Sequence, residues 1–174
     1  MKKKLFGGAL AVLVLALVIS ALVVSLPAYR EKAQDPRNDT VTMLAHLRWG
    51  LDPTTLVIDL LSIRPTASML DVDRSMLDMA AALSDYRFNR VHLAWRGQTR
   101  FVMDGSYFQT LGKERGFQNP VYVLRTLPEN MYTPSGRQAF GTWTGGILGV
   151  VSRQMEDHNQ MHEDWYMLDA IRSF

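Results

Sequence analysis

Two histidines near the C-terminus have the spacing with which a helix presents two ring nitrogens to one metal ion. His158 and His162 are four residues apart, so on a helix one ring lies a turn above the other. Helical zinc sites use this i, i+4 arrangement. The sequence therefore offers His158 and His162 as candidate metal ligands and zinc as the candidate cofactor.

The remaining ligands of such a site are not evident from the sequence. The chain has no cysteine, and its other two histidines, His46 and His92, are isolated. The run from His158 to His162 lacks the glutamate of HExxH and of HxxEH, the helical motifs of zinc proteases. The alternative is that both rings pack in the core or at an interface and donate to carbonyl groups.

A glycine-rich segment, 141–149, precedes the two histidines. Free N–H groups at the start of a helix can bind an anion, which makes Gly145 and Gly146 candidate anion-binding residues. The segment lacks the Lys-Ser/Thr pair of a P-loop and the strand-helix-strand setting of a dinucleotide fold. Close backbone packing is the alternative explanation of these glycines.

Aromatic residues are concentrated in the middle of the chain, where prolines interrupt regular structure. Aromatic side chains fill cores, but they are also enriched where proteins contact each other. We predict partner-binding residues at Tyr132, Phe140, Trp143 and Trp165.

No motif for catalysis is present. The serines do not occur in GxSxG or SxxK, and Asp71, Asp73 and Asp78 are predicted to lie on the solvated face of a helix. No carboxylate has the apolar setting that would raise its pKa for acid catalysis. Whether the protein is an enzyme stays open, and the sequence favours a non-catalytic role.

The N-terminus predicts a membrane anchor. Leu5 to Leu26 is uncharged and follows three lysines, and as a helix it would span roughly 33 Å, enough for a hydrocarbon core. Pro27 is expected to end that helix. A cleaved signal peptide is the alternative, but its apolar region is shorter and its cleavage site needs small residues where Leu26 stands. We predict an uncleaved signal anchor over 1–28.

Charge predicts the orientation and the partners. By the positive-inside rule the N-terminus is cytoplasmic, and the C-terminal domain is periplasmic or extracellular on the inner (cytoplasmic) membrane. Apart from the three N-terminal lysines the chain has 16 basic and 17 acidic side chains, which argues against a nucleic-acid partner. The expected partners are the lipid bilayer, through Leu5 to Leu26, and another envelope protein.

Hydrophobic periodicity predicts an α+β fold with a linker, 29–38, and one exported domain, 39–174. The domain is expected to have N-terminal helices, a three-stranded antiparallel sheet and a long C-terminal amphipathic helix. The hairpin is expected to set Phe101 opposite Leu93 or Trp95 through an odd-numbered loop. The predicted helices are 39–49, 52–61 (with a buried strand as the alternative), 66–86, 106–111 and 145–172, and the predicted strands are 91–95, 99–103 and 121–126.

The predicted membrane anchor and the absence of a catalytic motif favour a membrane-anchored envelope protein with a non-catalytic binding, scaffold or accessory-subunit role. Two alternatives remain. The first is a metal-binding protein or metal-dependent enzyme that uses the histidine pair. The second is an anion- or lipid-binding periplasmic domain.

Overall fold

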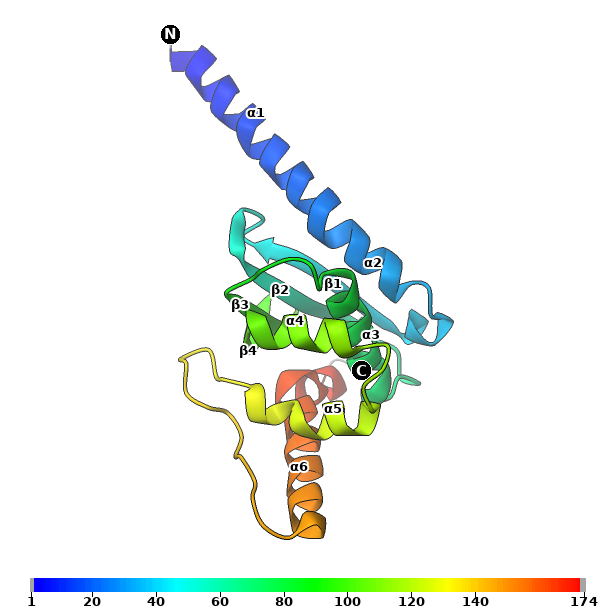
Figure 1. Cartoon of the computed structure of the whole chain (residues 1–174). Coiled ribbons are helices and arrows are strands. Elements are labelled where there is room, and N and C mark those ends of the chain that lie inside the picture. Colours follow the sequence, from blue (N-terminus) through cyan, green and yellow to red (C-terminus); the bar gives the residue numbers. More distant parts are fainter. Residues whose placement is uncertain (1, 173–174) are drawn as a thin grey trace.

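A computed structural model describes the backbone of residues 2–172 and the side chains from residue 11 to residue 172. The fold is mixed α+β, with a four-stranded sheet and a long apolar N-terminal helix that extends away from the rest of the chain (Figure 1). The mixed class agrees with the sequence prediction. The sheet has one strand more than expected.

The N-terminal helix continues to Lys32 instead of ending at Pro27. It comprises α1 (Lys2–Ser20), a π-helical turn (Ala21–Ser25) and α2 (Leu26–Lys32). In the widened turn the Leu26 N–H donates to the Ala21 carbonyl, five residues back. A proline cannot donate to the residue four positions earlier, and the π-helical turn just before Pro27 lets the helix pass this position. Residues 11–32 are long and apolar enough to cross a membrane.

One stripe of this helix packs on the domain. Ser20, Val24, Ala28 and Lys32 are spaced by four residues, and all four are buried. Val24 and Ala28 belong to the same hydrophobic core as the sheet. The other faces of residues 11–23 expose large apolar side chains, among them Val12 and Ile19. One face of the helix is therefore covered by protein, and the other faces of residues 11–23 expose apolar surface.

The sheet has the order β1-β2-β3-β4. Its outer pairs are antiparallel, whereas β2 and β3 are parallel. The parallel pair is joined by a helix, α3 (Met69–Ala82), since parallel strands need a crossover connection. The strands are β1 (Val41–Arg48), β2 (Asp52–Ile63), β3 (Arg90–Trp95) and β4 (Gln98–Asp104).

The predicted helices over 39–49 and 52–61 are wrong, because these residues form β1 and most of β2. In β1 burial alternates with period two through Val41, Met43 and Ala45. In β2 every residue from Thr55 to Leu60 is buried, as in a central strand covered on both faces. The buried strand considered for 52–61 is therefore the correct alternative.

The predicted strand over 121–126 is also wrong, since these residues belong to helix α5 (Pro120–Thr126). The Asn119 side chain accepts a hydrogen bond from the Val121 N–H, and Pro120 occupies the first helical position. Both are standard signals of a helix start. This local chemistry outweighs the strand preference of Val121, Tyr122 and Val123.

The β3–β4 hairpin is confirmed, but with a two-residue loop, Arg96-Gly97, between Trp95 and Gln98. A register shift after Leu93 then brings Phe101 opposite Leu93. The expected apolar pair thus forms through a bulge and not through an odd-numbered loop.

The remaining helices surround this sheet. They are α3 (Met69–Ala82), α4 (Gly105–Glu114), a 3-10 turn (Pro36–Thr40) and a second 3-10 turn (Pro128–Asn130). The C-terminal helix comprises α6 (Ile147–His162), a π-helical turn (Glu163–Met167) and α7 (Leu168–Ile171). Its last part lies below the sheet, and its start projects away from the anchor (Figure 1).

Candidate functional site

The structure brings His158 and His162 together with Asp73, a residue of α3 that is far away in the sequence. The His158 Nε2 lies 3.0 Å from Asp73 Oδ2, and the His162 Nε2 lies 3.0 Å from Asp73 Oδ1. The two imidazole rings are 4.7 Å apart between centroids. We call Asp73, His158 and His162 the Asp-His-His cluster.

The cluster lies in the protein interior. Asp73 is 1%, His158 2% and His162 0% exposed. Buried ionisable groups need partners, and here each carboxylate oxygen has one imidazole. The cluster therefore ties α3 to the C-terminal helix.

The hydrogen bonds indicate where the protons are. The His162 Nδ1 lies 3.1 Å from the Tyr166 hydroxyl, so both nitrogens of His162 can carry a proton and still have a partner. The His158 Nδ1 is buried without a hydrogen-bond partner, so a proton there would be costly. The arrangement favours an Nε2 proton on both rings, where the Asp73 carboxylate accepts it.

The pKa values of Asp73 and of its neighbour Tyr166 are both shifted from their ordinary values. Burial opposes the ionisation of Asp73, but the charge of His162 and the hydrogen bonds from both histidines outweigh it and lower the pKa of this carboxyl. Burial, followed by the negative charges of Asp73 and Asp71, raises the pKa of Tyr166. Asp73 is thus held ionised and Tyr166 protonated.

The same three residues satisfy the donor requirements of a metal site. One ligand atom from each lies within 4.8 Å of those of the other two. Two imidazoles and a carboxylate form a common ligand set for zinc, and Tyr166 would hold the far nitrogen of His162 as an outer-sphere partner. A cavity of about 270 Å³ lies beside the cluster, and its lining includes Asp73, Leu77 and three arginines, Arg37, Arg74 and Arg115.

Asp73 was missed because it was assigned to the polar face of its helix. It lies four residues after Met69 and four before Leu77, which places it on the apolar side of a 3.6-residue period. The neighbouring carboxylates have other roles. Asp71 forms a capping box with Ser68 at the start of α3, and Asp78 binds Asn38 and Arg115.

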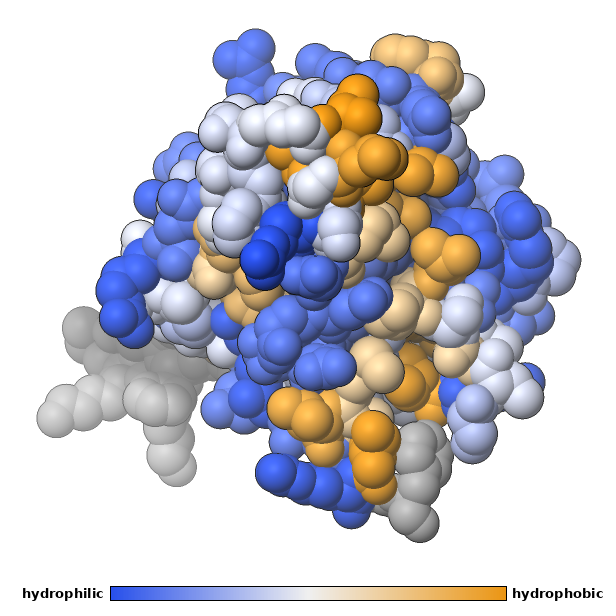
Figure 2. Space-filling view, turned by 90° about the horizontal axis from the view of Figure 1, so that it is seen from below, coloured by the Kyte–Doolittle hydropathy of each residue, from blue (hydrophilic) through white to orange (hydrophobic). Residues whose placement is uncertain are grey.

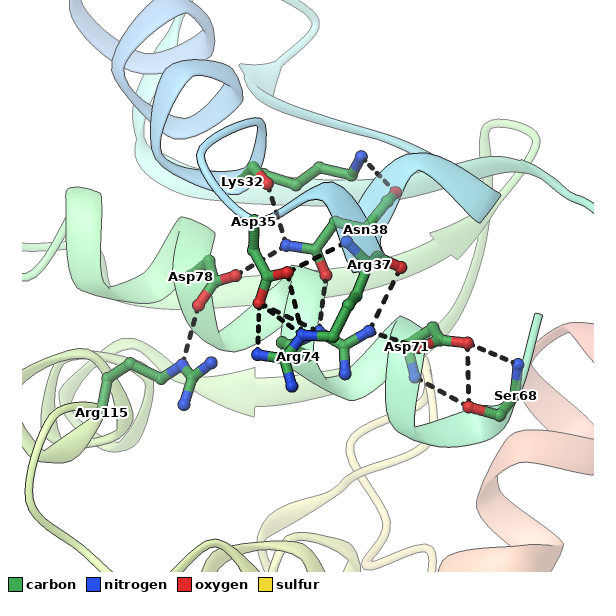
Figure 3. A network of polar contacts seen from close by, with 9 residues as sticks. All are labelled: Lys32, Asp35, Arg37, Asn38, Ser68, Asp71, Arg74, Asp78 and Arg115. Atoms are coloured by element: carbon green, nitrogen blue, oxygen red, sulfur yellow. Dashed lines mark hydrogen bonds and ion pairs between the residues drawn. The ribbon is translucent and has the colours of Figure 1, made fainter.

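A second polar network joins the anchor helix to α3 (Figure 3). The Lys32 ammonium donates to the Asn38 carbonyl at 2.9 Å, and the Asn38 amide donates back to the Lys32 carbonyl at 2.9 Å. The same amide also donates to Asp78 Oδ2 at 2.7 Å, and Arg74 Nε donates to Asn38 Oδ1 at 3.0 Å. We call Lys32, Asn38, Arg74 and Asp78 the anchor junction.

The anchor junction fixes the segment predicted as a linker, residues 29–38. Asn38 is fully buried and Lys32 is 6% exposed. Because the polar groups of both residues are bonded within the fold, this segment does not act as a free tether in the structure.

The predicted partner-binding aromatics have different environments. Trp165 is fully buried and donates its indole N–H to the Ala94 carbonyl at 2.9 Å, so this side chain is part of the core. Phe140 packs on Phe101, with 5.5 Å between centroids, and Trp143 donates to Asp157 at 2.7 Å. Tyr132 forms backbone bridges to Val102 and Gln138.

The predicted anion-binding glycines lie at the exposed start of α6. Gly146 is the N-cap residue and carries no capping side chain, and Gly145 has a φ of 125°. The positive φ explains why glycine stands at 145. Anion binding at Gly145 and Gly146 stays a prediction.

Comparison with known proteins adds no relative: no family model, no curated protein and no solved structure matches this chain. The chemistry of the site and the geometry of the anchor are therefore the basis for proposing a function.

Proposed function

We propose that this chain is a single-pass membrane protein of the cell envelope whose domain serves as a non-catalytic binding or accessory subunit. The supporting observation is the packing of the apolar helix on the domain through a buried stripe and the anchor junction. A domain fixed in this way keeps one orientation relative to the membrane. The α5–α6 end of the domain lies opposite the start of α1 (Figure 1), so it would face away from the bilayer.

This distal end carries exposed apolar side chains on two helices. Val121 and Tyr122 of α5 are 62% and 47% exposed, and Ile147 and Leu148 of α6 are 76% and 85% exposed. A cavity of about 480 Å³ lies between these helices. Seen from this end, apolar residues form patches among hydrophilic ones (Figure 2). Exposed apolar patches with a polar rim are typical of protein-binding surfaces.

Replacing Ile147 by Asp is expected to abolish capture of the partner while leaving the melting temperature unchanged. A charge at this position disrupts an apolar interface, and its own side chain contributes little to the fold. The measurement is affinity capture from detergent-solubilised membranes, with thermal melting of the same preparations.

Ile171→Asp is the matched control, because Ile171 is 68% exposed at the opposite end of the C-terminal helix. The control should retain the partner. Identical capture by both variants would contradict a binding surface at the α5–α6 end.

A second candidate function is metal binding by the Asp-His-His cluster, which the convergence of Asp73 on the histidine pair favours. With all three residues buried, zinc at this position would stabilise the fold by joining α3 to α6. Imidazole ligates metal through an unprotonated nitrogen, so binding at Nε2 would require the ring proton of each histidine to be on Nδ1. Tyr166 could accept that proton from His162, whereas the Nδ1 of His158 has no partner among the described residues.

Chelator-treated full-length protein is expected to melt at a higher temperature as zinc is added. A ligand that binds only the folded state at 100 times its Kd stabilises it by about 2.7 kcal/mol. His162→Gln should lose both the shift and the bound zinc, whereas replacing the isolated His46 by Gln should keep them. An unchanged melting temperature with no zinc retained after desalting would exclude this second function.

A further inference from the structure

The turn between β1 and β2, residues 49–51, lies beside the middle of the anchor helix and not at its end. A Cβ atom built on Gly50 would stand 2.3 Å from Leu17 Cδ2, so the backbone of the turn contacts the Leu17 side chain. Leu17 lies fifteen residues before Lys32, where the helix ends. The domain therefore reaches well back along the helix that is proposed to cross the membrane.

The length of the helix places this contact at the level of the lipid. The 13 residues from Lys4 to Leu17 rise about 20 Å along a helix, whereas the hydrocarbon core is about 30 Å thick. With the three lysines on the cytoplasmic side, roughly 10 Å of core remain on the domain side of Leu17. A tilted helix crosses less of the core between Lys4 and Leu17, so the remaining thickness on the domain side would be larger. The β1–β2 turn must then occupy part of the leaflet that faces the domain.

The residues of the turn suit such a place. Trp49 is 76% and Leu51 44% exposed, although both are large and apolar. Trp49 has a φ of 54°, a conformation that a side chain of this size rarely adopts. The Arg48 guanidinium lies 4.4 Å from the centre of the Trp49 ring. Tryptophan is enriched at the membrane interface, and arginine can extend from there to the headgroups.

The polar end of the turn is satisfied within the chain. The Asp52 carboxylate accepts hydrogen bonds from the Thr54 N–H at 2.9 Å and from the Thr54 hydroxyl at 2.7 Å. Trp49, Leu51 and Arg48 are thus the side chains of this turn that remain available for contacts outside the domain.

We infer that the β1–β2 turn inserts Trp49 and Leu51 into the headgroup-acyl boundary of the bilayer that the anchor crosses, so that the domain contacts lipid at two places. This inference rests on the proposed membrane anchoring. The second contact would fix the rotation of the domain about the anchor and so define which way the α5–α6 end points.

Depth-dependent fluorescence quenching tests the inference on the full chain in phosphatidylcholine/phosphatidylglycerol vesicles. Because the chain has no cysteine, single cysteines can carry an environment-sensitive fluorophore at Leu51→Cys, Leu13→Cys or Ser152→Cys. Nitroxide groups on lipids, placed either near the headgroup or deep in the acyl chain, act as quenchers. Leu13 reports on the anchor, and Ser152 reports on the exposed part of α6.

The Leu51 probe is expected to be quenched severalfold more than the Ser152 probe, and more by the shallow quencher than by the deep one. The Leu13 probe should be quenched most by the deep quencher. Strong quenching at Leu13 with Leu51 no different from Ser152 would overturn the inserted turn and leave the anchor intact. Absence of quenching at Leu13 would refute the anchor itself, and with it this inference.

Discussion

Asp73→Ala is expected to lower the free energy of unfolding by about 3 to 5 kcal/mol, the range found when one partner of a buried ionic pair is removed. The variant leaves the Nε2 atoms of His158 and His162 without their acceptor in a site that is at most 2% exposed. Chemical denaturation of the full chain in detergent micelles, monitored by the fluorescence of the buried Trp165, measures the loss.

Asp164→Ala is the control. This carboxylate is on the same C-terminal helix but is exposed, where it accepts a bond from Gln160. Its removal should change stability by no more than about 0.5 kcal/mol. An Asp73→Ala protein as stable as this control would mean that the Asp-His-His cluster does not hold α3 to the C-terminal helix.

Acid should weaken the same contact. Since the folded state lowers the pKa of Asp73, its contribution is complete above the ordinary carboxyl pKa of about 3.9 and is lost as the pH falls through the lower folded value. The difference in stability between the wild type and Asp73→Asn should therefore be constant from pH 5 to about pH 4 and shrink below about pH 4. A difference that grows on acidification would contradict the assigned charge.

Replacing Leu13 and Leu17 by Arg is expected to release the protein from membranes. Both side chains are exposed on the apolar helix, at 42% and 40%, and an arginine at the bilayer centre costs about 2.5 to 3.5 kcal/mol on insertion. Two such changes together cost about 5 to 7 kcal/mol on insertion. The measurement is the fraction of protein that resists alkaline extraction from membranes.

Leu13→Ala with Leu17→Ala is the matched control, since it shortens the same side chains without adding charge. It should stay in the membrane fraction. Retention of the double-arginine protein in that fraction would show that the helix is not what holds the chain to the membrane.

Long, strongly periodic segments could be predicted from the sequence. Helix α3, the β3–β4 hairpin and the C-terminal helix each carry their period over enough residues to be identified. Strand β2 could not be assigned securely, because a strand buried on both faces has no alternation and resembles a buried helix. With 39–49 and 52–61 predicted as helices, the central strand β2 is missing from the predicted sheet, and its mixed topology cannot be derived.

A local signal identifies the structure at Asn119-Pro120 but points to the wrong structure at Pro27. Asn119-Pro120 marks a helix start, and this signal is more specific than the β-branched residues that follow it. Pro27 predicts a helix end, but the helix continues past it through a π-helical turn, and Val24 and Ala28 on either side of Pro27 pack in the core of the domain. Such packing is a tertiary effect that sequence periodicity does not contain.

The histidine pair of the candidate site could be predicted from the sequence, but its partner Asp73 could not. The spacing of His158 and His162 is local and predicts that the two rings share a helix face. Their partner Asp73 is 85 residues from His158, and only the fold shows that the two helices meet. The position of Asp73 among apolar residues was the available signal, and it was hidden by two neighbouring aspartates that are not buried.

The central proposal is that the domain is exported and anchored to the membrane. It is tested most directly by determining on which side of the cytoplasmic membrane the domain lies. A single cysteine at Ser152, an exposed position on α6, can be treated in intact cells with a thiol reagent that does not cross the cytoplasmic membrane. An exported domain is expected to be labelled in intact cells, after permeabilisation of any outer membrane, to the same extent as in lysed cells. Labelling only after the cytoplasmic membrane is broken would contradict an exported, membrane-anchored domain.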